Sequence, residues 1–472
     1  MSEKKVVDYA ALEPVPKDKR NMNFLDMLAT WTGANANNGT WYVGGVVGAA
    51  GFGGALIVTL VSNPIAYILM AFIGFMGYKI GTSTMSLVRP SLGIRGSYIL
   101  SLFNALQYIG WTAVNTFLAA ISISYILHET MHAPAYGSAG GNQTMLTGII
   151  IMTVLHFLSI MMGHKSVKFV ERIGMVLILI LGIWETVVVL QQVSISQIIH
   201  WHPSKTSSMP LGIAMDTMFA FSLGWIPVIA DFTRYTKKKS DATIAPLIGA
   251  NIGLFWFVFV GLIATIGTAI STGVYDPNNS DPSTIASKLG LGGIAFLIIV
   301  LTSTTANAID LLGAGISITN LNKKIKSIPA LLFATILAGI LTVVPLYLGS
   351  FLEAFESLLN YINMVFGPIF GIMIIDFFLL KKKKYDAKEL DKKHGQYWYF
   401  HGFNLCAVGT WALCIIFYLI MKDMSLFTSS IGATFPTIVL SGIVYFVISK
   451  AVISFSQQKQ KVADPLPSEE KL

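Results

Sequence analysis

Charged residues are scarce in this sequence. Asp, Glu, Lys and Arg make up 12% of its 472 residues, whereas soluble domains carry about 25%. Hydrophobic residues make up 54% of the chain, and the mean hydropathy is +0.66. These values exclude an ordinary soluble domain and indicate a protein that crosses a membrane several times.

Cysteine is also scarce, with two residues in the chain, Cys406 and Cys414. A helix would separate them by about 12 Å, which is too far for a disulfide. Of the eight histidines only His156 lies well inside an apolar segment. We find no Cys–His metal spacing and no pairing of nucleophile and base, so an enzyme is not expected. The polar N-terminal stretch lacks the pattern of a signal peptide.

Long apolar runs, in contrast, are abundant. Twelve are long enough to cross a bilayer, which takes about 20 helical residues. They lie near 24–47, 53–79, 97–127, 143–162, 173–193, 211–233, 242–270, 291–319, 328–349, 352–380, 401–421 and 431–452. The sequence therefore predicts an all-α polytopic membrane protein with twelve transmembrane helices.

The placement of basic residues predicts the orientation of these segments. With the N-terminus inside, 29 of the 32 Lys and Arg residues fall on the inner side. The outer loops hold only Lys205, Lys288 and Lys422. By the positive-inside rule, both termini are then cytoplasmic. The formal net charge of +8 thus follows from topology, and nucleic acid is not an expected partner.

The first apolar segment is interrupted by Trp31–Trp41, which reads WTGANANNGTW. Glycine and asparagine are poor helix formers, and irregular backbone at membrane depth is tolerated only around a cavity lined by protein. We interpret the stretch as a helix broken at mid-membrane. The alternative is a face of small residues packed against another helix.

The sixth segment is interrupted in the same way, because Gly224 and Pro227 lie near its middle. Two broken helices five segments apart indicate an inverted five-helix repeat with a binding site at the repeat interface. The predicted parts are a cytoplasmic tail at 1–23, repeats at 24–193 and 194–380, a loop with two further helices at 381–452, and a second tail at 453–472.

The third segment carries a polar helical face made by Asn104, Gln107, Trp111 and Asn115, spaced three, four and four residues apart. An indole among amides suits a flat ligand that forms hydrogen bonds. The alternative is hydrogen bonding between helices beside a packed tryptophan.

The eighth segment contains the hydroxyl cluster Thr302–Thr305, followed by Asn307 and Asp310. Hard cations prefer oxygen ligands, although hydroxyls in membrane helices often bond to their own backbone. An ionisable residue inside a membrane span is a functional candidate. Asp310 is the first such candidate, and Glu185 in the fifth segment is the next.

Five motifs together resemble the nucleobase–cation symporter-1 family, which includes cytosine, allantoin, hydantoin and fungal purine–cytosine permeases. They read WTGANANNGTWYVGG, QYIGW, DFTRY, TSTTANAID and GPIFGIMIIDFFLLKKKKY, in that order along the chain. The resemblance implies the LeuT-type fold, with a 5+5 inverted repeat and broken helices 1 and 6. It also implies cation-coupled uptake of a planar heterocycle.

The resemblance, with the residue patterns above, gives the candidate site. Trp111 matches the family's stacking tryptophan, and Phe221 or Ser222 falls at the aromatic position of helix 6. The candidate substrate-binding residues are Trp111, Gln107, Asn115, Phe221, Ser222, Trp225, Asn307, Asp310, Asn35 and Ala36. The candidate sodium ligands are Thr304, Thr305, Leu301, Thr32 and Asn35.

Asp310 stands where some family members have a substrate-binding asparagine. An ionised carboxylate only accepts hydrogen bonds, so it favours a ligand with an amino group, such as cytosine or a thiamine-precursor pyrimidine. Alternatively, Asp310 is protonated in the empty site and acts as a donor or proton carrier.

The sequence thus predicts a plasma-membrane symporter that imports a nucleobase or related heterocycle with sodium, by alternating access. The alternative is a proton-coupled symporter of a purine, allantoin or hydantoin. No cofactor other than the coupling ion is expected, and the lipid bilayer is the expected surrounding. The oligomeric state is left open, with a monomer as one option.

Overall fold

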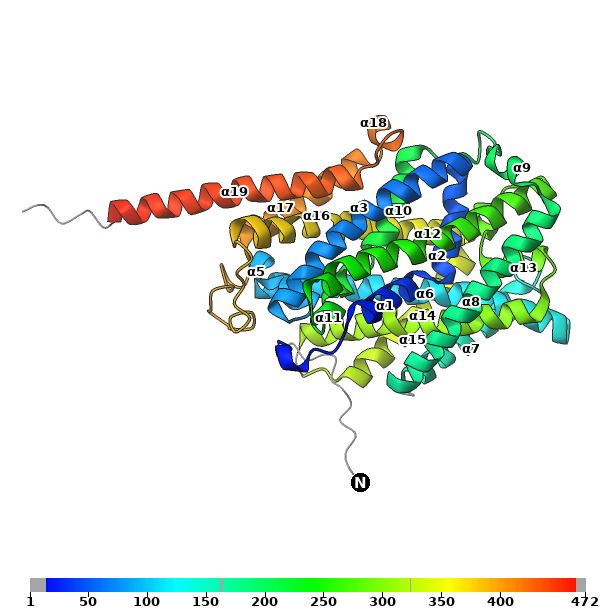
Figure 1. Cartoon of the computed structure of the whole chain (residues 1–472), viewed down its shortest axis with the longest axis horizontal. Coiled ribbons are helices and arrows are strands. Elements are labelled where there is room, and N and C mark those ends of the chain that lie inside the picture. Colours follow the sequence, from blue (N-terminus) through cyan, green and yellow to red (C-terminus); the bar gives the residue numbers. More distant parts are fainter. Residues whose placement is uncertain (1–13, 162–163, 323, 464–472) are drawn as a thin grey trace, which may run out of the picture.

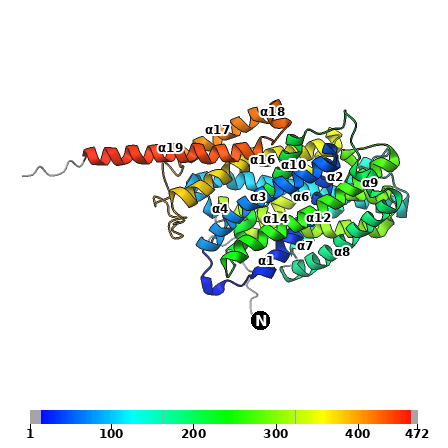
Figure 2. The same ribbon diagram turned by 45° about the horizontal axis from the view of Figure 1, so that its top comes forward.

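The computed structural model describes residues 14–161, 164–322 and 324–463. Within these ranges the regular structure is helical, apart from two isolated β-bridges. The helices form a bundle, and α19 (Thr434–Ala463) extends beyond the rest of it in both views (Figures 1 and 2). The all-α class predicted from the sequence is therefore confirmed.

A helix or a broken pair of helices occupies each predicted apolar segment. In chain order these are α1 (Phe24–Asn35) with α2 (Asn38–Val47), α3 (Gly51–Ile80), α6 (Ile94–Met131), α7 (Gly141–Met161), α8 (His164–Gln192), α10 (Leu211–Leu223) with α11 (Ile229–Thr233), α12 (Lys239–Thr272), α14 (Gly292–Leu321), α15 (Ser327–Leu348), α16 (Phe351–Ile375), α17 (Leu405–Met421) and α19. Short helices lie between them: α4 (Thr84–Leu87), α5 (Arg89–Leu92), α9 (Ile195–Ile199), α13 (Pro282–Lys288) and α18 (Ser425–Thr428).

In the part of the chain that the structure describes, nine helical stretches are long and apolar enough to cross a membrane. Two shorter apolar helices, Val176–Gln192 and Leu405–Met421, add to these. The number of twelve spans therefore stays a prediction, and so does the division of the chain into tails and repeats.

The two predicted helix breaks are present, and local chemistry explains both. The first falls between α1 and α2, where Asn37 is extended and its Oδ1 accepts from Thr40 N at 2.9 Å. This is a helix N-cap, which starts a new helix. The second falls after α10, where Gly224 ends the helix and Pro227 lies in a 3-10 turn (Ile226–Val228) before α11.

Helix packing has the pairing expected of the inverted repeat. The first broken helix packs through α1 on the seventh helix, α12, and the sixth packs through α11 on the second helix, α3. In a five-helix repeat, helix 1 corresponds to helix 6 and helix 2 to helix 7. The contact of helix 1 with helix 7 therefore corresponds to the contact of helix 6 with helix 2. A Cβ at Gly253 of α12 would lie 2.3 Å from Thr32 O, and one at Gly77 of α3 would lie 2.4 Å from Thr233 Oγ1. Glycine is therefore required for close approach in both pairs.

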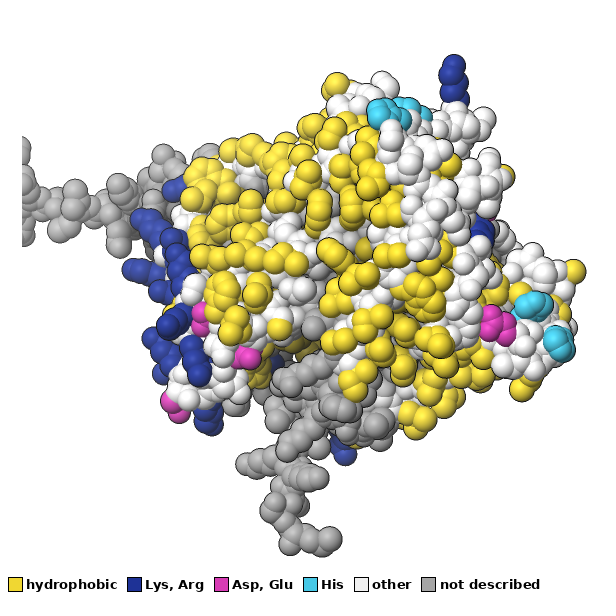
Figure 3. All heavy atoms as spheres, turned by 45° about the vertical axis from the view of Figure 1, so that its right-hand side comes forward, with side chains coloured by type: hydrophobic (Ala, Val, Ile, Leu, Met, Phe, Trp, Pro, Cys, Tyr) yellow, Lys and Arg dark blue, Asp and Glu magenta, His cyan; other side chains and the backbone are white. Residues whose placement is uncertain are grey.

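The surface is consistent with a membrane setting. Figure 3 shows hydrophobic side chains over most of the visible face, with Lys and Arg gathered mainly at one end. Large apolar residues such as Ile57, Ile340 and Ile443 are more than half exposed, which a soluble monomer rarely tolerates over so wide an area. The chain is therefore membrane-embedded.

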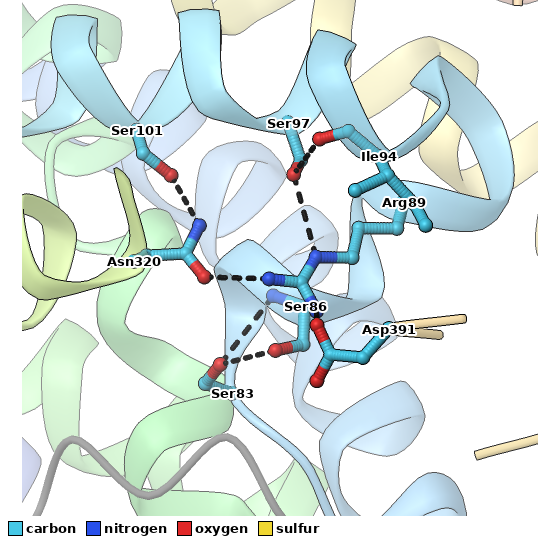
Figure 4. Close-up of polar contacts among 8 residues, drawn as sticks. All are labelled: Ser83, Ser86, Arg89, Ile94, Ser97, Ser101, Asn320 and Asp391. Carbon is cyan, nitrogen blue, oxygen red and sulfur yellow. Dashed lines mark hydrogen bonds and ion pairs between the residues drawn. The ribbon is translucent and has the colours of Figure 1, made fainter. Parts of the chain in front are cut away.

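A buried polar network joins the loop after α16 to the bundle (Figure 4). Arg89 in α5 is 1% exposed and pairs with Asp391 in that loop. Its Nη2 donates to Asn320 Oδ1 at 2.8 Å, and Asn320 Nδ2 donates to Ser101 Oγ of α6 at 2.7 Å. The network thus connects the lysine-rich loop to α5, α6 and α14.

Candidate functional site

A pocket lies where the two broken helices meet α6 and α14. Its lining comes from the α1–α2 break, from α6, from α10 and the break after it, and from α14. The lining residues are Asn37, Tyr108, Trp111, Asn115, Phe221, Gly224, Trp225 and Asp310. The two breaks therefore bring loop backbone and helix ends to one place inside the bundle.

Aromatic rings form much of the pocket wall. Trp111 meets Phe221 edge to face, with ring centroids 5.1 Å apart and an angle of 78° between planes. Phe355 makes a second edge contact with Trp111 at 6.0 Å. Trp225 is held in the same way by Trp31 at 6.1 Å. Such contacts are favourable geometries for aromatic pairs, so each indole is oriented by packing.

The polar part of the pocket is rich in acceptors. Asn115 Nδ2 donates to Asp310 Oδ2 at 3.2 Å. Because the amide nitrogen of Asn115 faces Asp310, its amide oxygen faces away from that residue. That oxygen is buried and has no hydrogen-bond partner among the described residues. The main-chain oxygen of Gly224 is already engaged by Gln107 Nε2 at 2.8 Å and by the Tyr108 hydroxyl at 3.2 Å.

The pocket contains five of the candidate substrate-binding residues. These are Trp111, Asn115, Phe221, Trp225 and Asp310. They come from three helical segments that are far apart in sequence, so the structure brings together what sequence patterns singled out separately. Their role in binding stays a prediction.

Two candidates from the first break are not among the lining residues. Asn35 is the last residue of α1, and its side chain is fully engaged, because Nδ2 donates to Trp31 O at 3.0 Å and Oδ1 accepts from the Tyr67 hydroxyl at 2.6 Å. Ala36 packs in a separate apolar cluster with Trp41. Asn37, one residue further on, reaches the pocket instead.

Three other candidates are also absent from the pocket lining. Ser222 donates to Asn63 Oδ1 of α3 at 2.7 Å, so its hydroxyl is directed towards α3. Asn307 turns towards His156 of α7 and donates to Thr112 O of α6 at 3.1 Å. Gln107 is one layer behind the pocket, where it holds the Gly224 carbonyl.

The role of the predicted sodium ligands stays a prediction, because the structure describes them only in part. Thr304 Oγ1 donates to Val300 O of its own helix at 2.9 Å, and Leu301 was predicted to contribute its main-chain carbonyl. Thr32 and Asn35 were also predicted to contribute carbonyls, and the carbonyl of Thr32 accepts from Ala36 N at 3.1 Å at the end of α1. The side chain of Thr305 lies outside the described residues.

A different oxygen set on α14 faces the first broken helix. The side-chain nitrogen of Asn38 lies 3.2 Å from Ile299 O, 3.3 Å from Thr302 Oγ1 and 2.6 Å from Ser303 Oγ. This set has the same spacing as Leu301, Thr304 and Thr305 but begins two residues earlier.

Comparison with known proteins identifies the family. Residues 14–447 match the family model described as a permease for cytosine/purines, uracil, thiamine and allantoin. The chain belongs to this permease family. Since the match covers nearly the whole chain, the protein is a transporter and not an enzyme.

Individual relatives of this permease agree with that assignment. It is 25% identical to a purine-uracil permease from Arabidopsis thaliana over 84% of this chain and 68% of the relative. It is 24% identical to an allantoin permease from Bacillus subtilis over 83% of each chain. Its structure superposes on Mhp1, a nucleobase-cation-symport-1 family transporter with bromovinylhydantoin bound, with a TM-score of 0.74, 17% identity and 97% coverage of both chains. The LeuT-type fold is thereby confirmed.

Three lining residues of the permease were missed from the sequence, and each carried a signal. Tyr108 lies three residues before Trp111 and seven before Asn115, so it shares their helical face. Asn37 lies three residues before Thr40, which is the spacing of an N-cap. Gly224 marks the break itself, where exposed backbone was expected.

Proposed function

We propose that the protein is a secondary active transporter that imports a nucleobase or related planar heterocycle across the plasma membrane, with sodium as the coupling ion. Amino-bearing pyrimidines such as cytosine are the favoured substrates. Both termini lie on the cytoplasmic side. The observation that carries the proposal is the pocket at the two helix breaks, where oriented indoles stand beside a carboxylate and an amide.

The aromatic wall supports a flat ligand. Trp111 and Trp225 are each 8% exposed, and both line the pocket. Phe221 and Phe355 contact Trp111 with their edges, so the indole keeps one orientation. A planar ring stacks on such a surface, and stacking on an aromatic side chain is worth about 1–3 kcal/mol per base.

The acceptors support a ligand that carries N–H groups. Asp310 offers a carboxylate, and Asn115 offers a buried amide oxygen without a partner among the described residues. A buried acceptor left unsatisfied costs about 1–3 kcal/mol. A ligand that donates to both groups removes this cost, whereas one that presents only carbonyl oxygens there does not. Cytosine and other aminopyrimidines meet this requirement.

Sodium is supported by the hydroxyl cluster Thr302–Thr305 on α14. Thr302 and Ser303 of this cluster contact Asn38, which places the cluster next to the first broken helix. Oxygen ligands suit hard cations, and coupling ions in transporters of this architecture bind at such helix breaks. The ligands predicted from the sequence would hold the ion, namely Leu301, Thr304 and Thr305 of α14 with Thr32 and Asn35 of the first broken helix.

Proton coupling is the second candidate, and Glu185 favours it. This residue of α8 is 0% exposed, and neither carboxyl oxygen has a hydrogen-bond partner among the described residues. An ionised carboxylate without a partner is very costly to bury, so this carboxyl group is expected to bind a proton. Glu185 would then carry the charge that the gradient moves.

A thermal-shift screen of the purified full chain, followed by uptake into vesicles, tests the proposal. The ligands are cytosine, uracil, adenine, allantoin, hydantoin and a thiamine-precursor pyrimidine, each with sodium or choline at fixed pH. We expect stabilisation by an aminopyrimidine, stronger in sodium, and uptake that needs a sodium gradient. Uptake driven by a proton gradient alone would favour the second candidate. Stabilisation by none of the ligands would contradict heterocycle transport.

Replacing Gly224 by alanine tests whether ligand binding depends on the position of the Trp111 indole. The φ of Gly224 is −54°, so alanine adopts this backbone without strain, but its Cβ would lie 3.0 Å from Trp111 Nε1. The indole must shift, and losing about 1 kcal/mol of stacking weakens binding about fivefold. The matched control is Gly53→Ala in α3, where a Cβ meets nothing within 4 Å. Calorimetry on both variants measures the effect, and equal affinities would contradict it.

A further inference from the structure

His156, the histidine that lies well inside an apolar segment, is placed where three helices meet. It belongs to α7 and is 1% exposed. Its Nδ1 lies 3.2 Å from Thr116 Oγ1 of α6 and 3.2 Å from Asn307 Nδ2 of α14. Its Nε2 lies 3.3 Å from the same Asn307 nitrogen. His156 is not among the residues that line the pocket, so any effect on the ligand must pass through its neighbours.

The hydrogen bonds around His156 fit a neutral ring that carries its proton on Nδ1. Thr116 donates its one hydroxyl hydrogen to Thr112 O at 2.6 Å, so it can only accept from His156. The ring then donates from Nδ1, which leaves Nε2 as an acceptor. Nε2 faces the amide nitrogen of Asn307, which only donates. Both ring nitrogens therefore have a partner of the right kind, which a phenyl ring of similar shape would not provide.

The amide of Asn307 joins α14 to α6 at this level. Its Nδ2 donates to Thr112 O at 3.1 Å and lies 3.2 Å from Thr116 Oγ1, and both oxygens belong to α6. Asn307 is 0% exposed, so water does not compete for these contacts. His156 contacts the same amide from the side of α7, and it thereby restricts the amide to this orientation.

The cluster lies next to the two polar residues of the pocket. Asn307 is three residues before Asp310 on α14, and Thr116 directly follows Asn115 on α6. Residues three apart on a helix share a face. The hydrogen bond from Asn115 to Asp310 measures 3.2 Å, at the long end of the usual range of about 2.7–3.2 Å. The relative position of these two side chains therefore depends on the neighbouring contacts between α6 and α14.

Other polar contacts between these two helices lie further from the pocket. Asn104 donates to Ser317 Oγ at 2.8 Å, and Asn320 donates to Ser101 Oγ at 2.7 Å, as Figure 4 shows. Ser317 and Asn320 are about two and three helical turns beyond Asp310, whereas Asn307 is within one turn of it. The contacts of Asn307 and His156 are thus better placed to control the geometry of the pocket.

We propose that His156 is a positioning residue for the pocket. It does not contact the ligand. It holds Asn307 and Thr116, and these residues set how Asp310 and Asn115 face each other. The carboxylate and the amide are then kept at one spacing, which suits an amino-bearing heterocycle. The proposal rests on the heterocycle recognition proposed above, and it adds a residue of α7 to those on which specificity depends.

Two substitutions of His156 separate positioning from packing. His156→Phe keeps a ring of similar shape and removes both nitrogens, whereas His156→Asn keeps a polar group near the place of Nδ1 and removes the rest of the ring. We expect the phenylalanine variant to bind cytosine about tenfold less tightly, the loss that corresponds to one hydrogen bond to a charged group. Its ratio of cytosine to uracil affinity should also fall. The asparagine variant should recover most of both, and a role in packing alone predicts the reverse order.

Calorimetry on the purified full chain measures the two affinities. His200→Phe is the matched control, because His200 is exposed and its Nδ1 contacts Ser196 O at 2.8 Å, and it should change neither affinity. Asn307→Leu should reproduce His156→Phe, and the double variant should lose no more than either single one, because residues that act through one another are not additive. An unchanged affinity ratio in His156→Phe, or additive losses in the double variant, would overturn the proposal.

A measurement without ligand separates this proposal from the function on which it rests. The melting temperatures of His156→Phe, Asn115→Ala and their double variant form a cycle in the empty protein. If His156 aligns Asn115 with Asp310, the shift of the double variant is smaller than the sum of the single shifts, whereas the same cycle with His200→Phe is additive. Additive shifts in both cycles would rule out the positioning role. Non-additive shifts in a protein that binds no heterocycle would support that role, and the substrate assignment would fail.

Discussion

Trp111→Ala is expected to reduce heterocycle affinity by about 5- to 150-fold while leaving the protein folded. Stacking on an aromatic side chain is worth about 1–3 kcal/mol per base, and about 1.4 kcal/mol corresponds to a tenfold change. The indole lines the pocket and is oriented by Phe221 and Phe355, so its removal deletes a fixed stacking surface. Trp111→Phe should retain part of the affinity. Calorimetry with the ligand found in the thermal-shift screen measures the loss.

Trp256→Ala is the matched control for this substitution. Trp256 lies in α12 and is 45% exposed on the outer face, so its removal deletes the same side chain away from the pocket. It should leave affinity unchanged. If Trp111→Ala binds as tightly as Trp256→Ala, then Trp111 serves only in helix packing, as in the alternative drawn from the sequence.

The fold was predictable because the membrane imposes strong constraints. A helix about 20 residues long is needed to cross a bilayer, and every backbone group must be satisfied there. Apolar runs therefore located most helix ends to within a few residues, although α8 begins nine residues before its predicted start and α19 ends eleven residues after its predicted end. Glycine, asparagine and proline at mid-depth, as at Asn37 and Pro227, located the breaks. The five-segment spacing of the two breaks then gave the inverted repeat.

The first break shows where the sequence was insufficient. Three asparagines lie within four residues, and each has a different structural role. Asn35 closes the end of α1, Asn37 caps α2 beside the pocket, and Asn38 reaches α14. The residue type was the same in all three cases. Only the backbone path through the break decides which side chain points where, and that path depends on contacts from distant segments.

In the hydroxyl cluster of α14, too, the sequence did not predict which side chain points towards which neighbour. Thr302, Ser303, Thr304 and Thr305 are consecutive, and each step along a helix turns about 100°, so the cluster presents hydroxyls over most of the circumference. The resemblance to the family, and not the residue pattern, favoured Thr304 and Thr305 as cation ligands. The structure adds that Thr302 and Ser303 contact Asn38, a contact that spans more than half of the chain and that no local pattern predicts.

Asp310→Asn is expected to weaken amino-bearing ligands about five- to tenfold and to leave their oxo counterparts unchanged or tighter. Hydrogen bonds to charged groups contribute about 1.5–3 kcal/mol and neutral ones about 0.5–1.5 kcal/mol, and a difference of about 1–1.4 kcal/mol gives that factor. Asn115 already donates to Asp310. After the substitution the new amide oxygen would accept from Asn115, and the new N–H groups would face the ligand, where they repel an amino group and attract a carbonyl.

Cytosine and uracil form the ligand pair that measures this effect, because they differ at one exocyclic position and in one ring N–H. Their affinities are compared by calorimetry on the unmodified protein, on Asp310→Asn and on Glu353→Gln, an exposed acidic residue at the start of α16. The ratio of the two affinities should change only in Asp310→Asn. If the affinities for both ligands fall equally and the pH dependence of binding disappears, Asp310 binds a proton and does not recognise the amino group. The proton-coupled alternative would then be favoured, with Glu185 as the next residue to replace, because its carboxyl group is fully buried and has no hydrogen-bond partner among the described residues.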